Sequence, residues 1–335
     1  MKIAVFETED WEHRACLALQ PKHEVICTPD ALNAATAAAY ADAEILSPFV
    51  NSKLGAETLN LLPNVRFIAT RSTGYDHIDL ATCAARGIVV SNVPDYGDAT
   101  VAEHTFALLL GVARHLVEAV EHTRRGQFSQ SGLRGFELRG KTLGVIGTGR
   151  IGRRVIEIAN GFGMRVVAFD TYPNPDHARR LGFVYRNLEG VLAEADVVTL
   201  HVPSTPATIG MLSDRQFALM KRGVILVNTA RGTVIDIPAL VRALSEGQVQ
   251  AVGLDVLPQE PLIREEAMIF RSPAPAEHDL KALVANHVLL RFPNVVVTPH
   301  IAYNTENAVK RIIDTTLDNI RAFAKGQPQN VVNRV

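Results

Sequence analysis

The sequence has 335 residues, enough for two domains that each bury a core of their own. Its 34 basic and 35 acidic side chains give a formal net charge of -1, without the electrostatic footprint of a nucleic-acid or anionic-membrane binder. Cys16, Cys27 and Cys83 lack CxxC or metal-type spacing, so we expect a reducing compartment and no disulfide framework. No apolar run reaches transmembrane length and residues 2–6 read as a strand, so we predict a soluble, cytoplasmic protein.

The first hundred or so residues alternate short apolar runs with helical stretches. Helices are predicted for the alanine-rich residues 31–43 and for residues 79–86. This alternation is typical of a parallel sheet with helices on both faces. The predicted strands are residues 2–6, 23–27, 44–46, 66–69 and 88–90.

A long helical pattern over residues 99–125 separates this part from a second series of strands and helices. Residues 308–324 form a closing amphipathic helix in this reading. Residues 257–294, which contain four prolines before residue 276, are irregular. We therefore predict two α/β domains. The strands of the second are residues 143–146, 165–169, 197–200, 224–228, 251–254 and 295–297.

Glycines follow the first strand of the second domain in the string Gly147-Thr-Gly-Arg-Ile-Gly152. Gly147 permits a tight turn, Gly149 lets a pyrophosphate approach the backbone, and Gly152 lets the next helix press on the sheet. The start of that helix offers free N–H groups and positive dipole charge to phosphates. Asp170 ends the next strand, where it can accept hydrogen bonds from an adenosine ribose. The whole unit predicts a dinucleotide site.

Ligands of open α/β sheets bind beyond the carboxyl ends of the strands. The residues that follow four strands of the second domain supply a cation, acids and two imidazoles. We expect them around one cleft. They are His201-Val-Pro203, Thr229-Ala-Arg-Gly232, the run from Asp255 to Glu260, and Thr298-Pro-His-Ile301.

These motifs, in this order, resemble the D-isomer-specific 2-hydroxyacid dehydrogenase family over essentially the whole chain. The long insertion between Glu260 and His300 looks most like the D-lactate dehydrogenase branch of that family. Further strings that resemble this branch are Arg71-Ser-Thr-Gly-Tyr-Asp-His-Ile-Asp79, Val93-Pro-Asp-Tyr96, Ala102-Glu-His104 and His300-Ile-Ala-Tyr303.

The resemblance implies two doubly wound parallel-sheet domains. A Rossmann NAD-binding domain, residues 99–301, would be inserted into a flavodoxin-like catalytic domain formed by residues 1–98 and 302–335. It also implies NAD as cofactor and a homodimer, which we expect to form through the long helix after residue 99.

The family's catalytic trio falls on Arg231, Glu260 and His300. Hydride transfer to a 2-oxo acid leaves negative charge on the carbonyl oxygen, and His300 would supply the proton there and remove it in the reverse direction. Glu260 would accept a hydrogen bond from the other imidazole nitrogen and favour the protonated ring. Arg231 would grip the substrate carboxylate and polarise the carbonyl.

Other positions are implied only by the resemblance. The backbone amides of Thr73 and Gly74 would form a second clamp on the carboxylate. The aromatic side chains of Phe49, Tyr96 and Tyr303 would wall the pocket for the substrate side chain. The expected cofactor-binding residues are Gly147, Gly149, Arg150, Ile151, Gly152, Asp170, His201, Val202, Pro203, Thr208, Thr229, Ala230, Arg231 and Asp255.

Three assignments have plain structural alternatives. His104 lies within an apolar helix and reads as a hydrogen-bonding structural residue rather than a catalytic one. His201 reads as a cofactor-side loop residue rather than an acid or base. Asp255 fits either a nicotinamide-side role or a structural role at a strand end.

The leading hypothesis is NAD-dependent interconversion of D-lactate and pyruvate. The alternatives are a dehydrogenase for a bulkier acid such as 2-hydroxyisocaproate, and an NAD-sensing corepressor that binds protein partners. No metal is expected, since the sequence has no cysteine cluster that could supply soft zinc ligands.

Overall fold

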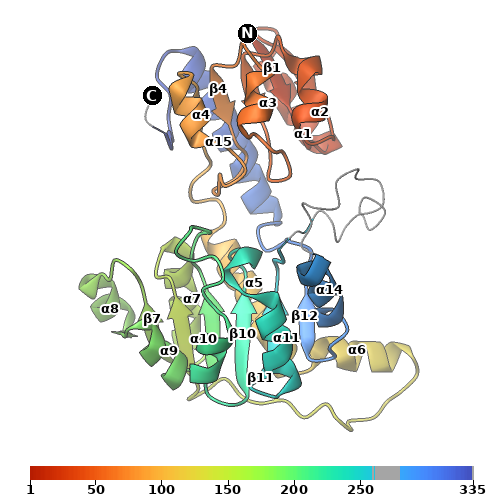
Figure 1. The fold of residues 1–335 in the computed structure, drawn as a ribbon, viewed down its shortest axis with the longest axis vertical. Helices are drawn as coiled ribbons and strands as arrows, with labels where there is room; N and C mark the ends of the chain where they lie inside the picture. The colour runs from red at the N-terminus through yellow and green to blue at the C-terminus, as the bar shows by residue number, and fades with distance from the viewer. Residues whose placement is uncertain (259, 261–279, 334–335) are drawn as a thin grey trace. The chain divides into compact units, whose positions relative to one another are not determined.

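The computed structural model describes residues 1–258, 260 and 280–333. The chain forms two compact α/β units (Figure 1). Unit 1 comprises Met1–Tyr96 and Asn304–Val335, and unit 2 comprises Gly97–Tyr303. None of the helices in the described part of the chain is both long and apolar enough to span a membrane.

Unit 1 contains a five-stranded parallel sheet with the strand order β2-β1-β3-β4-β5. This is the flavodoxin-like order, and it confirms the predicted fold class of the first domain. Both faces of the sheet are covered, so the short strands are apolar at most positions. They are β1 Lys2–Val5, β2 Glu24–Cys27, β3 Ile45–Ser47, β4 Phe67–Ala69 and β5 Val89–Ser91.

The last helix of the chain, α15 (Glu306–Ala324), completes the core of unit 1. Its Phe323 ring stacks on Phe67 of β4 with centroids 4.3 Å apart. Beyond α15, Asn333 accepts a hydrogen bond from the Val90 amide at 2.8 Å, so the chain end covers edge strand β5. The other helices of unit 1 are α1 Asp10–Cys16, η1 Leu17–Leu19, α2 Ala34–Ala37, η2 Ala38–Tyr40, α3 Ala56–Asn60 and α4 Leu80–Ala85.

Unit 2 contains a seven-stranded parallel sheet with the order β12-β11-β10-β9-β6-β7-β8. Counted from β6, this is the Rossmann order 3-2-1-4-5-6 with one further strand at the edge. The strands from β6 to β8 are added towards one edge of the sheet and those from β9 onwards towards the other, so the strand order reverses between the parallel neighbours β6 and β9. The strands are β6 Thr142–Ile146, β7 Arg165–Phe169, β8 Val184–Tyr185, β9 Val197–Leu200, β10 Val224–Asn228, β11 Val249–Leu254 and β12 Val295–Val297.

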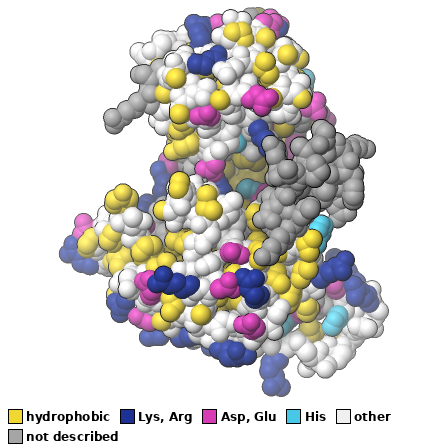
Figure 2. Space-filling view, viewed as in Figure 1, with side chains coloured by type: hydrophobic (Ala, Val, Ile, Leu, Met, Phe, Trp, Pro, Cys, Tyr) yellow, Lys and Arg dark blue, Asp and Glu magenta, His cyan; other side chains and the backbone are white. Residues whose placement is uncertain are grey.

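Helices cover both faces of this sheet (Figure 1). The buried helix α5 approaches β11 closely because Gly253 has no side chain; a Cβ there would lie 2.9 Å from that of Leu108. Basic and acidic side chains are interspersed on the face in Figure 2. The helices are α5 Asp98–Ala113, α6 Leu116–Arg124, α7 Arg150–Gly161, α8 Pro175–Leu181, α9 Leu188–Glu194, α10 Asp214–Leu219, η3 Gly232–Val234, α11 Ile237–Ser245 and α14 Leu280–Leu289.

Two helix predictions are corrected by the structure. The single helix expected over residues 99–125 is two helices, α5 and α6, because His115 adopts the left-handed conformation with φ +50°. The alanine-rich residues 31–43 form only the short α2 and η2; the Asn33 side chain caps α2, so the helix begins at Ala34 rather than at residue 31. Residues 259 and 261–279 of the irregular stretch expected at 257–294, which include much of the insertion between Glu260 and His300, lie outside the described residues; α14 forms within the remainder.

Candidate active site

The glycine fingerprint makes a close turn from β6 into α7. Gly147 has φ +96°, and a Cβ on it would lie 2.5 Å from the His201 carbonyl oxygen. A Cβ on Gly152 would lie 2.0 Å from the Gly147 oxygen. Only glycine fits either place. The turn therefore leaves the backbone N–H groups at the start of α7 open to a pyrophosphate, so the residues present fit a dinucleotide.

Asp170, directly after β7, is fixed by three donors. Its Oδ2 accepts from the Thr148 amide at 2.7 Å and hydroxyl at 2.8 Å, and its Oδ1 accepts from the Tyr172 amide at 2.9 Å. Burial raises the pKa of this carboxyl, but the hydrogen bonds from Tyr172 and Thr148 outweigh it and hold the pKa below its ordinary value. The carboxylate is therefore charged and oriented.

Sequence reasoning missed two residues that support Asp170. The Thr148 hydroxyl also lies 2.9 Å from the Tyr185 hydroxyl, which accepts from the Asn174 amide at 3.2 Å. Because Thr148 gives its one proton to Asp170, Tyr185 donates to Thr148. Thr148 could have been suspected as the variable residue inside the fingerprint, whereas Tyr185 on the two-residue strand β8 carries no sequence signal.

His201 follows β9, on the other side of the point where the strand order reverses. Burial lowers the pKa of its ring to about 3, and its Nε2 lies 2.9 Å from the Thr199 hydroxyl. A ring that stays neutral at physiological pH does not serve as the acid in reduction, in line with its reading as a loop residue. Next to it, the Thr208 hydroxyl donates to the Pro203 carbonyl oxygen at 2.6 Å and stiffens the loop.

Arg231 lies in the turn after β10. The Asn228 side chain holds this turn: its Oδ1 accepts from the Ala230 amide at 2.9 Å, and its Nδ2 donates to the Arg231 carbonyl oxygen at 2.9 Å. The Arg231 guanidinium donates to the Ala230 oxygen at 2.8 Å. A guanidinium is planar and permanently charged, so its shape matches a carboxylate through two parallel hydrogen bonds.

His300 and Glu260 are paired. His300 Nδ1 lies 2.8 Å from Glu260 Oε2, and the other carboxylate oxygen accepts from the Leu257 amide at 3.1 Å. The contact expected between these two side chains is therefore present, although they are 40 residues apart. His300 has φ +56°, an uncommon backbone conformation for a residue with a side chain. The pairing fixes the orientation of the imidazole ring through Nδ1.

Asp255, which follows β11, is 1% exposed and bonds to the segment that carries His300. Its Oδ1 accepts from the Thr298 hydroxyl at 2.6 Å and the Ile301 amide at 2.9 Å, and its Oδ2 accepts from the Ala302 amide at 2.8 Å. Burial raises the pKa of Asp255, but hydrogen bonds led by that from His104 outweigh it and lower the pKa below its usual value. Both oxygens accept hydrogen bonds from this segment, which is what the structural alternative for Asp255 expects.

The residues of unit 1 that are expected to contact the substrate follow three neighbouring strands. Phe49 comes after β3, Thr73 and Gly74 after β4, and Tyr96 after β5. The Thr73 hydroxyl donates to the Val93 carbonyl oxygen at 2.8 Å, which fixes the turn. These residues share the carboxyl edge of the sheet of unit 1. Tyr303 belongs to unit 2, three residues after His300.

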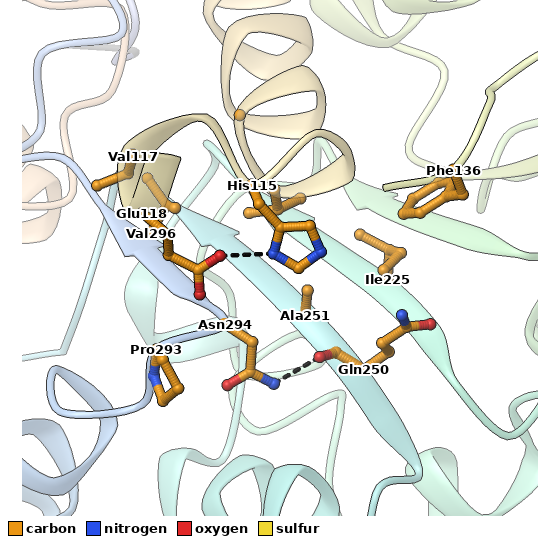
Figure 3. Close-up of a pocket in the computed structure, with 12 residues that line it drawn as sticks. His115, Val117, Glu118, Phe136, Ile225, Gln250, Ala251, Pro293, Asn294 and Val296 are labelled. Atoms are coloured by element: carbon orange, nitrogen blue, oxygen red, sulfur yellow. Dashed lines mark hydrogen bonds and ion pairs between the residues drawn. The ribbon is translucent and has the colours of Figure 1, made fainter. Parts of the chain in front are cut away.

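In unit 2, a small cavity lies at the edge of the sheet where the strands begin, away from the strand ends that carry the glycine turn and Arg231 (Figure 3). Gln250 and Asn294, at the starts of two strands, line it, and a His115–Glu118 pair at 2.5 Å lies beside them. The cavity measures about 30 Å³, room for about one or two water molecules. It is too small for a dinucleotide.

Comparison with known proteins decides the family. Residues 106–302, more than half of the chain, match the family model described as "D-isomer specific 2-hydroxyacid dehydrogenase, NAD binding domain". The chain belongs to the D-isomer-specific 2-hydroxyacid dehydrogenases. NAD is accordingly the cofactor of this dehydrogenase, and the glycine turn and Asp170 are the residues that fit it.

Similar proteins carry more than one substrate name. A glyoxylate reductase of Thermococcus litoralis is 36% identical over 88% of this chain and 84% of its own length. A 2-hydroxyacid dehydrogenase homolog of Haemophilus influenzae is 35% identical over 99% of both chains. The crystal structure of D-lactate dehydrogenase from Aquifex aeolicus, complexed with NAD and lactic acid, is 35% identical with a TM-score of 0.88 and covers 97% of this chain and 96% of its own.

Proposed function

We propose that the protein is an NAD-dependent D-lactate dehydrogenase that interconverts D-lactate and pyruvate. The observation that carries the proposal is the 2.8 Å contact between His300 Nδ1 and Glu260 Oε2. A histidine held at one nitrogen by a carboxylate is a proton donor and acceptor with a fixed orientation. The likeness to a lactate-complexed relative over nearly the full length supports the choice of lactate.

In reduction, His300 donates the proton that the carbonyl oxygen of the 2-oxo acid takes up. Glu260 stabilises the imidazolium before transfer and keeps Nδ1 protonated. Arg231 grips the substrate carboxylate with two parallel N–H bonds and polarises the carbonyl, which an ammonium group could not do as well. When bound, NADH supplies the hydride. In oxidation the same side chains act in reverse, with His300 as base.

Substrate size and handedness follow from the remaining expected contacts. The Thr73 and Gly74 amides are a second clamp on the carboxylate in this proposal, so carboxylate and oxygen are both held and one carbonyl face is presented. The fourth substituent then points towards Phe49, Tyr96 and Tyr303. Three aromatic rings favour a substituent of about methyl size. Each further methylene changes discrimination by about 1–3 kcal/mol.

Glyoxylate is the second candidate substrate, because several relatives that are 35–37% identical are named glyoxylate reductase. Glyoxylate bears hydrogen where pyruvate bears methyl. A pocket that fills around the methyl group loses contacts with glyoxylate, and its catalytic efficiency should be lower.

Steady-state kinetics with NADH over glyoxylate, pyruvate, 2-oxobutyrate and 2-oxoisocaproate test the proposal. We expect pyruvate to have the highest kcat/KM, 2-oxobutyrate to be weaker but measurable, and D-lactate but not L-lactate to be oxidised. A preference for glyoxylate or 2-oxoisocaproate would keep the reaction type and change the substrate. Absence of turnover with all four acids, alongside tight NADH binding, would favour the NAD-sensing corepressor alternative.

We also propose a homodimer that forms through helix α6 and the segment after it. Leu116 and Val117 of α6 are 57% and 44% exposed, and Phe128 is 95% exposed. Neighbouring exposed apolar side chains of this size are typical of an interface. Sedimentation equilibrium should give a dimer for the wild-type chain and a monomer for Val117→Glu. A wild-type monomer at micromolar concentration would contradict the proposal.

A further inference from the structure

Two adjacent residues of α5 bond to the two segments that hold the proposed catalytic side chains. His104 Nε2 lies 3.0 Å from the Thr298 hydroxyl, and the Thr105 hydroxyl lies 2.9 Å from the Thr229 hydroxyl. Adjacent helix residues point about 100° apart, so a single turn can reach two strand ends. Thr229 follows β10 and Thr298 follows β12, on either side of β11. The close approach of α5 to β11 at Gly253 makes both contacts possible.

A chain of hydrogen bonds leads from His104 to the backbone beside His300. Thr298 has one hydroxyl proton, which it donates to Asp255 at 2.6 Å, so His104 Nε2 must be the donor to Thr298. His104 Nε2 also lies 3.4 Å from Asp255 Oδ1. Asp255 then accepts from two backbone amides that directly follow His300. His300, at φ +56°, therefore lies between its own contact with Glu260 and the two amides that Asp255 holds.

Thr105 performs the matching task for the other segment. Its hydroxyl donates to the Val101 carbonyl oxygen at 2.8 Å within α5, so the Thr229 hydroxyl is the donor across the 2.9 Å contact. Thr229 opens the turn that ends at Arg231, and the Asn228 side chain closes that turn. Thr105 is 1% and Thr229 is 8% exposed, so water competes little for this bond.

We infer that one turn of α5 is a positioning element for catalysis: His104 fixes the segment of His300, and Thr105 fixes the segment of Arg231. The inference rests on the proposed catalytic roles of His300 and Arg231. Neither His104 nor Thr105 is a catalytic residue here; each acts through the residue it holds. The two contacts should therefore affect different kinetic constants.

Thr105→Val should raise the KM for the 2-oxo acid about ten- to a hundredfold, because Arg231 loses its alignment, while the NADH dissociation constant changes little. Thr316→Val is the matched control. Thr316 is 3% exposed and donates to the Ile312 carbonyl oxygen at 2.8 Å, the same bond within a helix that Thr105 makes. An equal rise of KM in both variants, or no rise in Thr105→Val, would overturn the assignment of Thr105.

His104→Leu should lower kcat about ten- to a hundredfold with a smaller change of KM. His104→Gln keeps an N–H donor near the Nε2 position and should recover most of the loss, which a general packing role would not predict. Loss without recovery in a Gln variant that unfolds at the wild-type temperature would refute the role of His104. Pyruvate and glyoxylate are the probes.

A second measurement does not depend on turnover. Hydrogen exchange at the Ile301 and Ala302 amides should speed up in His104→Leu and stay near wild type in His104→Gln, because only the first loses the donor that supports Asp255. Wild-type protein that turns over neither probe would refute the proposed function, and the exchange rates would still decide the role of His104. Unchanged exchange in His104→Leu would overturn the inference even where the wild type is active.

Discussion

Replacing Asp170 with asparagine is expected to narrow the preference for NADH over NADPH. The 2′-phosphate of NADPH would meet the Asp170 carboxylate, whose charge is maintained by the hydrogen bonds that lower its pKa. Two unit charges about 4 Å apart repel by about 1 kcal/mol in water and about 4 kcal/mol at an effective dielectric constant near 20. Asp170 is half-buried, so we take about 1–3 kcal/mol, or roughly fivefold to 150-fold in favour of NADH.

Asparagine keeps the shape and removes the charge. Its amide oxygen can accept from both Thr148 donors, but its NH₂ group then faces the Tyr172 amide, and this conflict costs about 1–3 kcal/mol of stability. Dissociation constants for NADH and NADPH, measured by fluorescence, give the preference without reference to any substrate. Asp176→Asn is the control, because Asp176 is an exposed carboxylate paired with Arg179 on α8. Equal affinities in the wild type, or an unchanged ratio in Asp170→Asn, would refute the reasoning.

The remaining predictions concern the proposed acid, its partners and acid stability. His300→Ala should lower turnover about a hundredfold to ten-thousandfold with NADH affinity nearly intact in a fluorescence titration; a loss under tenfold would mean that another group donates the proton. Arg231→Lys should mainly raise the KM for the 2-oxo acid, because an ammonium cannot form the two-bond fork; an unchanged KM would remove Arg231 from the substrate. Glu260→Gln should lower kcat, because the imidazolium loses the carboxylate that lies 2.8 Å from its Nδ1, and an unchanged kcat would contradict the pairing. Burial lowers the pKa of His201 to about 3, below the value of about 6.5 of an unfolded histidine. Below about pH 6.5 the unfolded chain therefore binds a proton at His201 that the native protein does not bind. The free energy of unfolding is unaffected by this histidine above about pH 6.5 and declines as the pH falls towards 3. In urea unfolding, His201→Gln should lose less stability between pH 7.5 and pH 5 than the wild type, and an identical decline in both would count against it.

Three inner strands of the unit 2 sheet are predicted to the residue, and β6 is predicted to within one residue. The runs at 165–169, 197–200 and 224–228 coincide with β7, β9 and β10. A parallel strand covered on both faces must be apolar at nearly every position, and turn residues end the run. The two-residue strand β8 was missed because a run of that length has no periodicity to detect.

The break between α5 and α6 could not be predicted in the same way. Neither Arg114 nor His115 is a helix-breaking residue type, and the helical periodicity of the sequence continues across them. His115 nevertheless adopts φ +50°, and its ring pairs with Glu118 in the next turn. A contact made by the folded chain overrides local propensity here.

Some residues of the candidate site could be predicted from the sequence and others could not. The glycines follow from backbone chemistry alone, because phosphate approach demands them. The pairing of Glu260 with His300 could be expected only from resemblance, since no local pattern links residues 40 positions apart. The support of Asp170 by Tyr185 was beyond sequence reasoning altogether, because it depends on how β7 and β8 are registered.

Because unit 1 is built from two separate pieces of the chain, its parts are translated at different times. Residues 1–96 leave the ribosome before unit 2, but α15, which stacks on β4, and the residues that cover β5 are translated after unit 2. Unit 2 is continuous in sequence and can fold while unit 1 still lacks a helix and leaves an edge strand bare. A premature stop codon before α15 would therefore spare the nucleotide-binding unit and release a chain whose first sheet is open to aggregation.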